Sequence, residues 1–423
     1  MPSSQSMLAV WECQQEGNSL GRSAIIIGAG VIGVTSAYAL ARRGWQVTIV
    51  DRSSGPAMEA SRANGAQLSY CYTDALGSPA ALASLPRFVF GGGGVSFRLP
   101  MSTDYACWLT QFALNCSAAK FRKNTLAVLD LAQHSRQAMA ALRERHDLQF
   151  AHRVAGKIHL LYSEKDRARA EQMQALKSAR GCEQHVLDRS ELARLDPALA
   201  GNDALDSDVI GAISTPSEVV GDPYLFCRNL LSVLTSDYGV KTRFNCAASA
   251  LEDGPDGARL TIAHGEKLTA DLAVVAAATD SNRLLAPLGR AITVQPMKGY
   301  SFEMPLSRGS PDISVTDSKR RLVFTHLKDR MRVAGIAELG NGSNDIDPAK
   351  IGWLIDAARD CMPDAGDYAK AGKFWAGLRP VTPNSQPVIS RASKAIAINT
   401  GHGALGWTLA MGSAERLAEL VEN

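Results

Sequence analysis

The sequence predicts an α/β protein with two domains, one built on a parallel sheet and one on a mixed, largely antiparallel sheet with helices. Short apolar strands alternate with helical segments near the start, in the middle and at the end of the chain, which is typical of a parallel sheet covered by helices. The segment 291–339 instead alternates as antiparallel strands do. The length of 423 residues suffices for both domains, at about 100–200 residues per domain.

The first strand and helix form the clearest local motif. An apolar strand at 23–27 leads into the glycine turn Gly28-Ala-Gly30-Val-Ile-Gly33 and a small-residue helix, and the next strand ends on Asp51. The glycines permit a tight turn, close approach of the backbone to a pyrophosphate and close packing of helix on strand. Asp51 lies where an acid binds ribose hydroxyls. The unit predicts a Rossmann-like dinucleotide-binding domain, and this motif does not decide which dinucleotide is bound.

Hydrophobic periodicity predicts the remaining elements in order. We expect helices at 34–43, 108–145, 164–180, 190–195, 224–237 and 351–361, and a final helix after the glycine turn at 401–406. We expect strands at 46–50, 157–162, 240–244, 259–263, 271–277 and 395–399, with antiparallel strands in 291–339 and a turn at 328–329. The strand at 271–277 is apolar on both faces, which indicates a return to the parallel sheet of the first domain.

The charge balance and the placement of Cys and His exclude several classes of protein. The 45 Lys and Arg against 42 Asp and Glu give a net charge of +3, which is too balanced for a nucleic-acid-binding protein. The eight cysteines and eight histidines show no metal-ligand spacing, so we assign no metal. The longest apolar run, 272–278, falls far below the about 20 residues that cross a bilayer, and residues 1–22 lack a signal-peptide pattern. We therefore expect a cytoplasmic protein without a transmembrane segment.

Several segments carry a more specific signal. They are 25–40 (IIIGAGVIGVTSAYAL), 61–69 (SRANGAQLS), 221–222 (GD), 298–301 (KGYS), 377–380 (GLRP) and 399–408 (NTGHGALGWT). Over about 23–420, and in the same order, the chain resembles the FAD-dependent D-amino acid dehydrogenase small subunit, within the wider D-amino acid oxidase and glycine oxidase-like family. The tail motif is the most specific piece, because an NAD-dependent dehydrogenase has no reason to carry it.

The resemblance implies a discontinuous Rossmann-like FAD-binding domain and a substrate-binding domain, with the flavin ring between them. The expected division is an N-terminal tail at 1–22, a FAD-binding domain at 23–85, 216–290 and 376–423, and a substrate-binding domain at 86–215 and 291–375. We expect noncovalent FAD, because no cysteine falls where related sarcosine oxidases attach flavin. The residues assigned to FAD are Gly28, Gly30, Val31, Ile32, Gly33, Asp51, Arg52, Ser61, Asn64, Gln67, Gly401, Gly403, Ala404, Leu405, Gly406 and Thr408.

For the substrate, the resemblance points first to Arg379. In this family the arginine of Gly-x-Arg-Pro binds the amino acid carboxylate, and a planar guanidinium matches a carboxylate bidentately. His402 is expected beside the flavin, or else as a polar turn residue. Tyr72 and Tyr300 are expected as pocket walls or hydrogen-bond donors to the carboxylate, and each is equally compatible with a core position.

The chain departs from the family pattern at two positions. Asn64 is followed by Gly65-Ala66 instead of Ala-Gly, and Ala278 stands where the family has glycine. A methyl group there would press on the cofactor, so we expect weaker FAD binding or a small backbone shift.

The implied reaction is oxidative deamination of a D-amino acid. The Cα hydride passes to flavin N5, and water hydrolyses the imino acid to a 2-oxo acid and ammonia. The resemblance further implies electron transfer to a quinone or another acceptor at the inner face of the cell membrane, with Phe88-Val-Phe90 as a candidate peripheral contact. The alternatives are a related amine or imino acid oxidase, such as a glycine, D-proline or opine oxidase-like subunit, a flavin-binding subunit inactive without a partner, and an NAD-dependent dehydrogenase.

Overall fold

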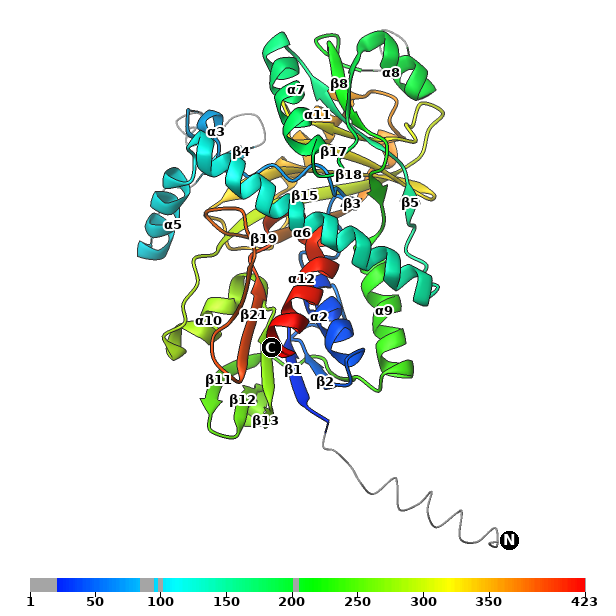
Figure 1. Cartoon of the computed structure of the whole chain (residues 1–423). Coiled ribbons are helices and arrows are strands. Elements are labelled where there is room, and N and C mark those ends of the chain that lie inside the picture. The colour runs from blue at the N-terminus through cyan, green and yellow to red at the C-terminus, as the bar shows by residue number, and fades with distance from the viewer. Residues whose placement is uncertain (1–20, 84–94, 98–101, 201–204, 423) are drawn as a thin grey trace, which may run out of the picture.

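A computed structural model describes residues 21–83, 95–97, 102–200 and 205–422, arranged around two large sheets (Figure 1). The sheet that contains β1 and β21 lies below, and the sheet that contains β15, β17 and β18 lies above. Most of the expected N-terminal tail and the segment Phe88-Val-Phe90 lie outside the described residues. The predicted α/β fold class is confirmed.

The lower sheet has the strand order β10-β2-β1-β14-β21-β20 within the described chain. Its strands are β1 (Ser23–Ile27), β2 (Gln46–Val50), β10 (Lys241–Arg243), β14 (Leu272–Val275), β20 (Val388–Arg391) and β21 (Ile396–Thr400). All neighbours pair in parallel except β20, which runs antiparallel at one edge. The central strands β1, β14 and β21 are apolar because helices or other strands cover both faces.

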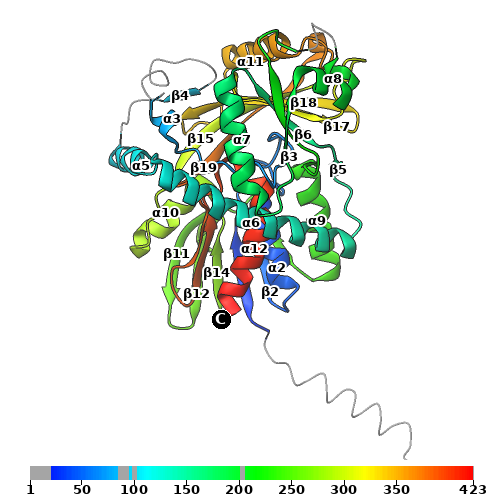
Figure 2. The same cartoon turned by 45° about the horizontal axis from the view of Figure 1, so that its top comes forward.

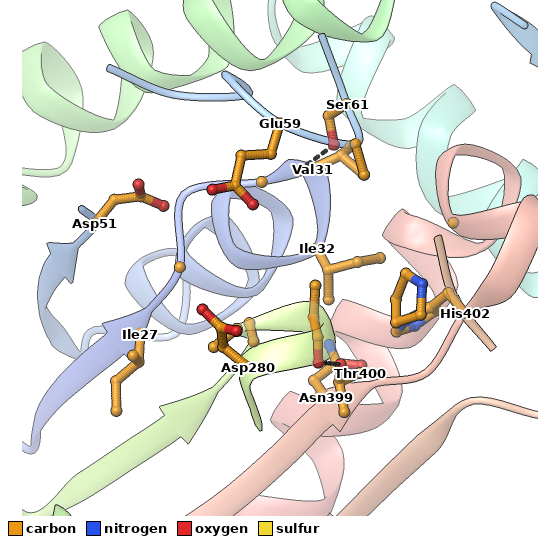
Figure 3. Close-up of a pocket in the computed structure, with 18 of the residues that line it drawn as sticks. Ile27, Val31, Ile32, Asp51, Glu59, Ser61, Asp280, Asn399, Thr400 and His402 are labelled. Atoms are coloured by element: carbon orange, nitrogen blue, oxygen red, sulfur yellow. Dashed lines mark hydrogen bonds between the residues drawn. The ribbon is translucent and has the colours of Figure 1, made fainter. Parts of the chain in front are cut away.

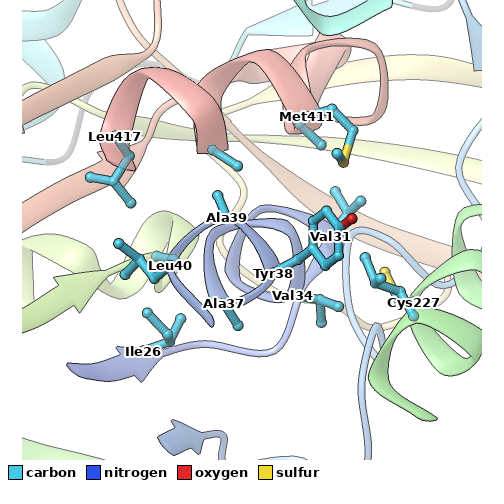
Figure 4. Close-up of a cluster of buried hydrophobic side chains, with 14 of the residues drawn as sticks. Ile26, Val31, Val34, Ala37, Tyr38, Ala39, Leu40, Cys227, Met411 and Leu417 are labelled. Carbon is cyan, nitrogen blue, oxygen red and sulfur yellow. The ribbon is translucent and has the colours of Figure 1, made fainter. Parts of the chain in front are cut away.

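Helices α2 (Val31–Ala41), α12 (Gly406–Glu422), α6 (Ala118–Arg145) and α9 (Pro223–Asp237) form the core on one face of this sheet. Small side chains such as Ala37 and Ala39 bring α2 close to its neighbours, and Met411 and Leu417 of α12 pack against it (Figure 4). A side chain at Gly412 would clash with the α6 backbone, 2.7 Å from the carbonyl oxygen of Leu131. This close packing attaches α6 to the first core, although the domain boundaries themselves remain predictions.

The opposite face is covered by a smaller antiparallel sheet, with the short helix α10 (Ser281–Leu285) beside it. Its strands are β11 (Ala248–Gly254), β12 (Gly257–Ile262) and β13 (Lys267–Ala270). The sequence predicts β12, whereas β11 and β13 were missed because buried apolar residues are few in both strands.

The upper sheet has the order β19-β15-β18-β17-β16-β6-β8-β7 in the described residues, and β4 also pairs with β18. Its strands are β4 (Val95–Phe97), β6 (Lys157–Leu161), β7 (His185–Asp188), β8 (Gly211–Thr215), β15 (Gln295–Pro305), β16 (Ser314–Asp317), β17 (Leu322–Leu327), β18 (Arg330–Leu339) and β19 (Gly372–Val381). The turn between β17 and β18 falls at 328–329, as the sequence predicts. Helix α11 (Pro348–Cys361) packs on β15 and β18, and the turned view shows it on the outer side (Figure 2).

The remaining helices are α3 (Pro79–Ala83), α5 (Thr103–Leu114), α7 (Glu164–Ser178) and α8 (Arg189–Leu195). The predicted helix at 108–145 is therefore two helices, because Ser117 caps α6 by accepting a hydrogen bond from the Lys120 N–H. Helix α2 begins at Val31, three residues earlier than predicted, since the glycine turn itself enters the helix. Every helix in the described ranges is too short or too polar to cross a bilayer.

The two sheets meet at the loop that follows α2 and β2. A small sheet of β3 (Gln67–Leu68), β9 (Val219–Val220) and β5 (Arg153–Val154) joins them. Side chains from β15, β17 and β18 also bind three consecutive carbonyl oxygens of this loop. The donors are Ser301 to Ala63 at 2.6 Å, Arg332 to Asn64 at 3.3 Å, and Thr325 to Gly65 at 2.7 Å.

Candidate active site

Two cavities lie where the sheets meet, and they join each other. The first lies at the carboxyl ends of β1, β2 and β14, and the second lies under the upper sheet. The residues that line both are Asn64, Arg379, His402, Gly403, Ala404 and Trp407. We call the first the dinucleotide cavity and the second the inner cavity.

The glycine turn between β1 and α2 shapes one end of the dinucleotide cavity. Gly28 has a φ of +111°, and a side chain there would clash with the Ala276 carbonyl oxygen. A side chain at Gly33 would overlap the Gly28 carbonyl oxygen, so Gly33 sets the packing of helix on strand. Gly30 faces open space, with Ser61 Oγ as its nearest neighbour at 3.7 Å from an ideal Cβ. Gly28 thus permits the tight turn and Gly33 the close packing of helix on strand, while the approach of a pyrophosphate to Gly30 stays a prediction.

Two polar side chains order the backbone around this turn. Asp51 accepts the Ala29 N–H at 2.6 Å with Oδ2 and the Ser53 N–H at 2.7 Å with Oδ1. Each carboxylate oxygen keeps acceptor capacity for a hydroxyl group. Ser61 Oγ accepts the Val31 N–H at 3.1 Å at the start of α2, which has no acidic residue in its first turn. That helix end therefore favours an anion.

Charged side chains surround the outer part of the dinucleotide cavity (Figure 3). Arg52 forms ion pairs with Glu59 and with Asp280, and all three side chains are exposed. Sequence reasoning found Arg52 and missed both acids. Asp280 was detectable in principle, because it follows the end of a central parallel strand, where ligand-binding residues of such sheets lie.

The tail turn after β21 forms the border between the cavities. Gly401 and Gly403 have φ values of +81° and +56°, which favour glycine. His402 is buried between them, and its Nε2 lies 2.8 Å from Ser413 Oγ. Burial lowers the pKa of His402 to about 3, so the imidazole is neutral at physiological pH.

Asn399 precedes this turn and is buried. Its Nδ2 donates to Ser36 Oγ at 3.0 Å, while its Oδ1 has no hydrogen-bond partner among the described residues. His402 Nδ1 also lacks a partner in that part of the chain. Buried polar atoms without partners are uncommon in folded proteins, so both atoms indicate a ligand in the dinucleotide cavity. Asn399 belongs to the tail motif seen in the sequence, but no role was assigned to it.

Arg379 enters the region shared by the two cavities from β19. Its Nη1 donates to the Ile336 carbonyl oxygen at 3.2 Å, and no acidic side chain pairs with it in the described chain. A side chain at Gly299 would overlap the guanidinium, so glycine makes room for it on β15. Desolvation lowers the pKa of Arg379 to about 10, which leaves it charged at neutral pH. The guanidinium lies deep in the protein and exposes part of its surface to the cavities.

The wall of the inner cavity contains residues from distant segments. The Tyr72 ring stacks on His159 of β6 with ring centroids 3.4 Å apart, and the pKa of His159 lies well below its usual value because of burial and the nearby cations Lys157 and Lys177. Lys157 Nζ donates to Ser69 Oγ at 2.7 Å. Lys157 and His159 were not identified from the sequence. They could have been noticed as two polar residues on the same face of a strand that is otherwise apolar.

Nearly all of the residues assigned from the sequence lie at these cavities. Gly28, Gly30, Val31, Ile32, Asp51, Arg52, Ser61 and Gly406 line the dinucleotide cavity, Gln67, Tyr72, Gly401, Leu405 and Thr408 line the inner cavity, and Asn64, Arg379, His402, Gly403 and Ala404 line both. Gly33 lies behind the turn. Tyr300 lies apart, buried in the core of the upper sheet with its hydroxyl 3.1 Å from Glu338 Oε2, so the structure supports the core interpretation for this tyrosine.

The two alanines that depart from the family pattern adopt glycine-like backbone conformations. Ala66 has a φ of 54° and Ala278 a φ of 50°. Such left-handed conformations cost roughly 1–2 kcal/mol for a residue with a Cβ. Ala278 also lines the dinucleotide cavity and Ala66 the inner cavity, and the effect of their methyl groups on FAD binding stays a prediction.

The residues present fit a dinucleotide that reaches from the glycine turn to Arg379. The open face of Gly30 and the start of α2 suit a pyrophosphate, Asp51 suits a ribose, and the partnerless Asn399 Oδ1 and His402 Nδ1 suit a polar ring system. The arrangement places the protein in the class of α/β, dinucleotide-dependent oxidoreductases.

The chain belongs to the DAO family of FAD-dependent oxidoreductases, whose family description matches residues 23–420. It is 38% identical over 410 residues to D-amino acid dehydrogenase 2 of Ralstonia nicotianae, covering 94% of this chain and 95% of the relative. It is 35% identical over 402 residues to D-amino acid dehydrogenase of Rhizobium johnstonii, again covering 94% and 95%. Glycine oxidase from Geobacillus kaustophilus has a similar fold, with a TM-score of 0.73 over 95% of each chain at 19% identity. The predicted family and the dependence on FAD are confirmed.

Proposed function

We propose that this protein is a FAD-dependent D-amino acid dehydrogenase that converts D-amino acids to 2-oxo acids and ammonia. The observation that carries the proposal is Arg379, a desolvated, only partly exposed guanidinium without an acidic partner in the described chain, at the junction of the two cavities. An unpaired buried charge is costly unless a ligand satisfies it. The names of the curated relatives supply the amino acid substrate and its D configuration.

Noncovalent FAD, when bound, supplies the acceptor for the hydride that leaves the substrate Cα. The glycine turn, Asp51 and Ser61 would hold its dinucleotide part, and the residues of the tail turn around His402 would hold its ring. Arg379 binds the substrate carboxylate bidentately and so fixes the orientation of Cα. Water then hydrolyses the C=N bond of the imino acid, which releases the 2-oxo acid and ammonia.

The neutral His402 adds no charge to the border of the two cavities. Its Nε2 contact with Ser413 orients the ring, and the free Nδ1 offers one hydrogen bond at the border of the cavities. Because the pKa of His402 is about 3, its protonation does not change between pH 5 and 9. Tyr72 forms part of the wall that receives the substrate side chain.

A related amine or imino acid oxidase remains the second candidate, because Arg379 would bind the carboxylate of glycine or D-proline equally well. The family match favours these flavoenzymes over an NAD-dependent dehydrogenase.

We also propose that the electrons pass to a quinone and that the protein is cytoplasmic, attached to the inner face of the cell membrane. Leu82 of α3 and Leu114 of α5 support this proposal, because both large apolar side chains are exposed. Cosedimentation with vesicles of anionic phospholipid tests the attachment. Protein that stays in the supernatant at low and high lipid concentrations contradicts it.

The decisive experiment is anaerobic mixing of the yellow holoenzyme with D-amino acids and their L enantiomers. We expect D-alanine and D-norvaline to bleach the bound flavin and the L enantiomers to leave it oxidised. Bleaching by glycine or D-proline alone would favour the second candidate. If no D-amino acid bleaches the flavin, the proposed function is wrong.

A further inference from the structure

The inner cavity has an unbalanced charge. Among the described residues its lining contains the cations Lys157, Arg321 and Arg379 and the acids Asp74 and Asp317. Cations outside the lining neutralise both acids. Lys177 Nζ lies 2.5 Å from Asp74 Oδ1, and Arg320 Nη1 lies 3.1 Å from Asp317 Oδ2.

One of the three cations is already satisfied by the protein. Lys157 Nζ donates to Ser69 Oγ, and the Glu218 carboxylate lies close enough to favour its charged form. Glu218 in turn accepts the backbone N–H groups of Tyr70 and Cys71, each at 2.7 Å. Lys157 is therefore held by Ser69 and by the nearby charge of Glu218, whereas Arg321 and Arg379 remain available to a ligand.

Arg321 is one of these two cations, and Arg379 is the other. Backbone contacts with β18 bring the turn that contains Arg321 close to Arg379. It ends the turn between β16 and β17, and its carbonyl oxygen would lie 2.8 Å from a Cβ added at Gly335. The next residue after Gly335 is Ile336, whose carbonyl oxygen accepts the hydrogen bond from Arg379. The side chain of Arg321 forms no ion pair within the described chain and is exposed where it lines the cavity.

The wall close to Arg321 is polar. Ser318 of the same turn lies near the Tyr72 hydroxyl, and Arg321 lies near enough to act on the pKa of Tyr72. Behind the Tyr72 ring, both ring nitrogens of His159 lack partners in the described residues, and so does Thr316 Oγ1. A pocket selective for aliphatic side chains would not leave these polar atoms and a free cation at its wall.

We propose that the end of the inner cavity formed by Arg321, Tyr72 and Ser318 is a subsite for a second carboxylate, so that the preferred substrates are D-amino dicarboxylic acids. This inference rests on the proposed function. Arg379 binds the α-carboxylate, and Arg321 binds the side-chain carboxylate at the exposed end of the cavity. The reaction at Cα is the same for every substrate, and the subsite acts only through binding.

The test compares D-glutamate with its near-isosteric neutral analogue D-glutamine, with D-norvaline as the reference. For the unaltered holoenzyme we expect a kcat/KM at least tenfold higher for D-glutamate than for D-glutamine, mainly through KM. The advantage should shrink as salt rises from 20 to 500 mM, because Arg321 is exposed and its charge is screened. If the enzyme turns over D-norvaline but its kcat/KM for D-glutamine equals or exceeds that for D-glutamate, the inference is overturned and the proposed function stays intact. If the enzyme turns over no D-amino acid, both are overturned.

Variants identify the residue responsible. We expect Arg321→Met to lower the ratio of kcat/KM for D-glutamate to kcat/KM for D-glutamine at least tenfold, and to remove the salt dependence of this ratio. Arg321→Lys should keep most of the preference for D-glutamate. Arg290→Met is the matched control, because Arg290 is exposed and lines neither cavity, and it should leave the ratio unchanged. An unchanged ratio in Arg321→Met, or an equal loss in Arg321→Lys and Arg321→Met, would contradict the assignment to the Arg321 charge.

Discussion

Two inward-facing arginines on the upper sheet differ in how they are paired. Arg332 of β18 is 3% exposed, and its Nη2 lies 2.8 Å from Asp222 Oδ2 and 2.7 Å from Glu303 Oε1. It also donates to the Asn64 carbonyl oxygen. Arg379 of β19 donates to a single carbonyl oxygen, that of Ile336, and contacts no acid among the described residues. One arginine is satisfied by the protein, and the other is kept for a ligand.

The acids around Arg332 explain why that region is structural. Asp222 caps α9 of the lower core through Oδ1, which accepts the Tyr224 N–H at 2.9 Å, while its Oδ2 binds the arginines of the upper sheet. Arg330 binds the same two acids, Asp222 and Glu303. The cluster therefore joins the two sheets and fixes the loop at Asn64, which borders both cavities. An unpaired arginine can bind a ligand in a defined orientation only if the surrounding chain is held in position. The Arg332 cluster supplies that support beside the cavities.

The largest expected effect is the loss of substrate binding when Arg379 is replaced. Arg379→Met should lower kcat/KM for D-norvaline about 1000-fold, since losing a buried charge-assisted pair costs about 4 kcal/mol and each 1.4 kcal/mol is tenfold. The free energy of unfolding should stay the same or rise, because an unpaired buried charge is removed. Steady-state kinetics and urea unfolding measure the two quantities. A loss of stability with unchanged kinetics would show that the two arginines do not differ as described.

Replacing Arg332 should have the opposite pattern. Arg332→Met should lower the free energy of unfolding by about 3 kcal/mol. This is the lower end of the range for breaking a buried ion pair, because Arg330 still binds both acids. Urea unfolding of the holoenzyme measures it. Arg308→Met, at an exposed arginine, is the control and should stay within about 0.5 kcal/mol of the unaltered protein. Equal stability of the two variants would refute the structural role of Arg332.

Glu303 makes the same cluster sensitive to acid. Burial alone would raise its pKa, but Arg332 and Arg330 lower the pKa of Glu303 to about 2, below the usual 4.5. Its contribution to stability is thus complete above pH 4.5 and is lost as the pH falls toward 2, on the order of 3 kcal/mol in total. Glu303→Gln should reduce stability at pH 7 by that amount and progressively less below pH 4.5.

Unfolding free energies of both proteins between pH 7 and 3 measure this difference. Glu171→Gln, at an exposed carboxylate, should show a difference near zero at every pH. A Glu303→Gln difference that stays constant down to pH 3 would contradict the assigned role of the two arginines.

The smallest expected effect concerns the space beside Arg379. Gly299→Ala places a methyl group where the guanidinium lies, so Arg379 must move and its alignment with the carboxylate weakens. We expect KM to rise about tenfold, or about 1.4 kcal/mol, with kcat little changed. Gly342→Ala is the control, since nothing lies within 4 Å of its Cβ. If both variants keep the original KM, the position of the guanidinium does not depend on Gly299.

Local patterns were sufficient to predict most of the fold. The turn at Gly28 and Gly33 was assigned correctly because its glycines are required by contacts within a few residues or between adjacent strands. The predicted helices and strands lie within a few residues of the observed ones, whereas β7, β8 and β19 of the upper sheet were not predicted. The strands β11 and β13 were not predicted from the sequence. A polar strand shows no clear alternation of apolar and polar residues when only one of its faces is partly buried.

The candidate site was predicted in part. The motifs identified the residues of the dinucleotide cavity, but Tyr72 and Tyr300 were equally plausible at the inner cavity, and only one of them lines it. The strand β15 is buried on both faces, so the sequence around Tyr300 does not show which side the ring faces. Lys157 and His159 reach the cavity only because β6 pairs with β16, more than 150 residues away.

The sequence by itself determined the glycine turns, the dependence on a dinucleotide and the arginine of the Gly-x-Arg-Pro motif, because each of these depends on neighbouring residues. The tertiary structure alone decided which arginine is neutralised. Asp222 and Arg332 are 110 positions apart in the chain, and their atoms come within 2.8 Å only after the two sheets pack together. Pairing of buried charges depends on distances of a few ångströms, and such distances between remote segments are set by folding.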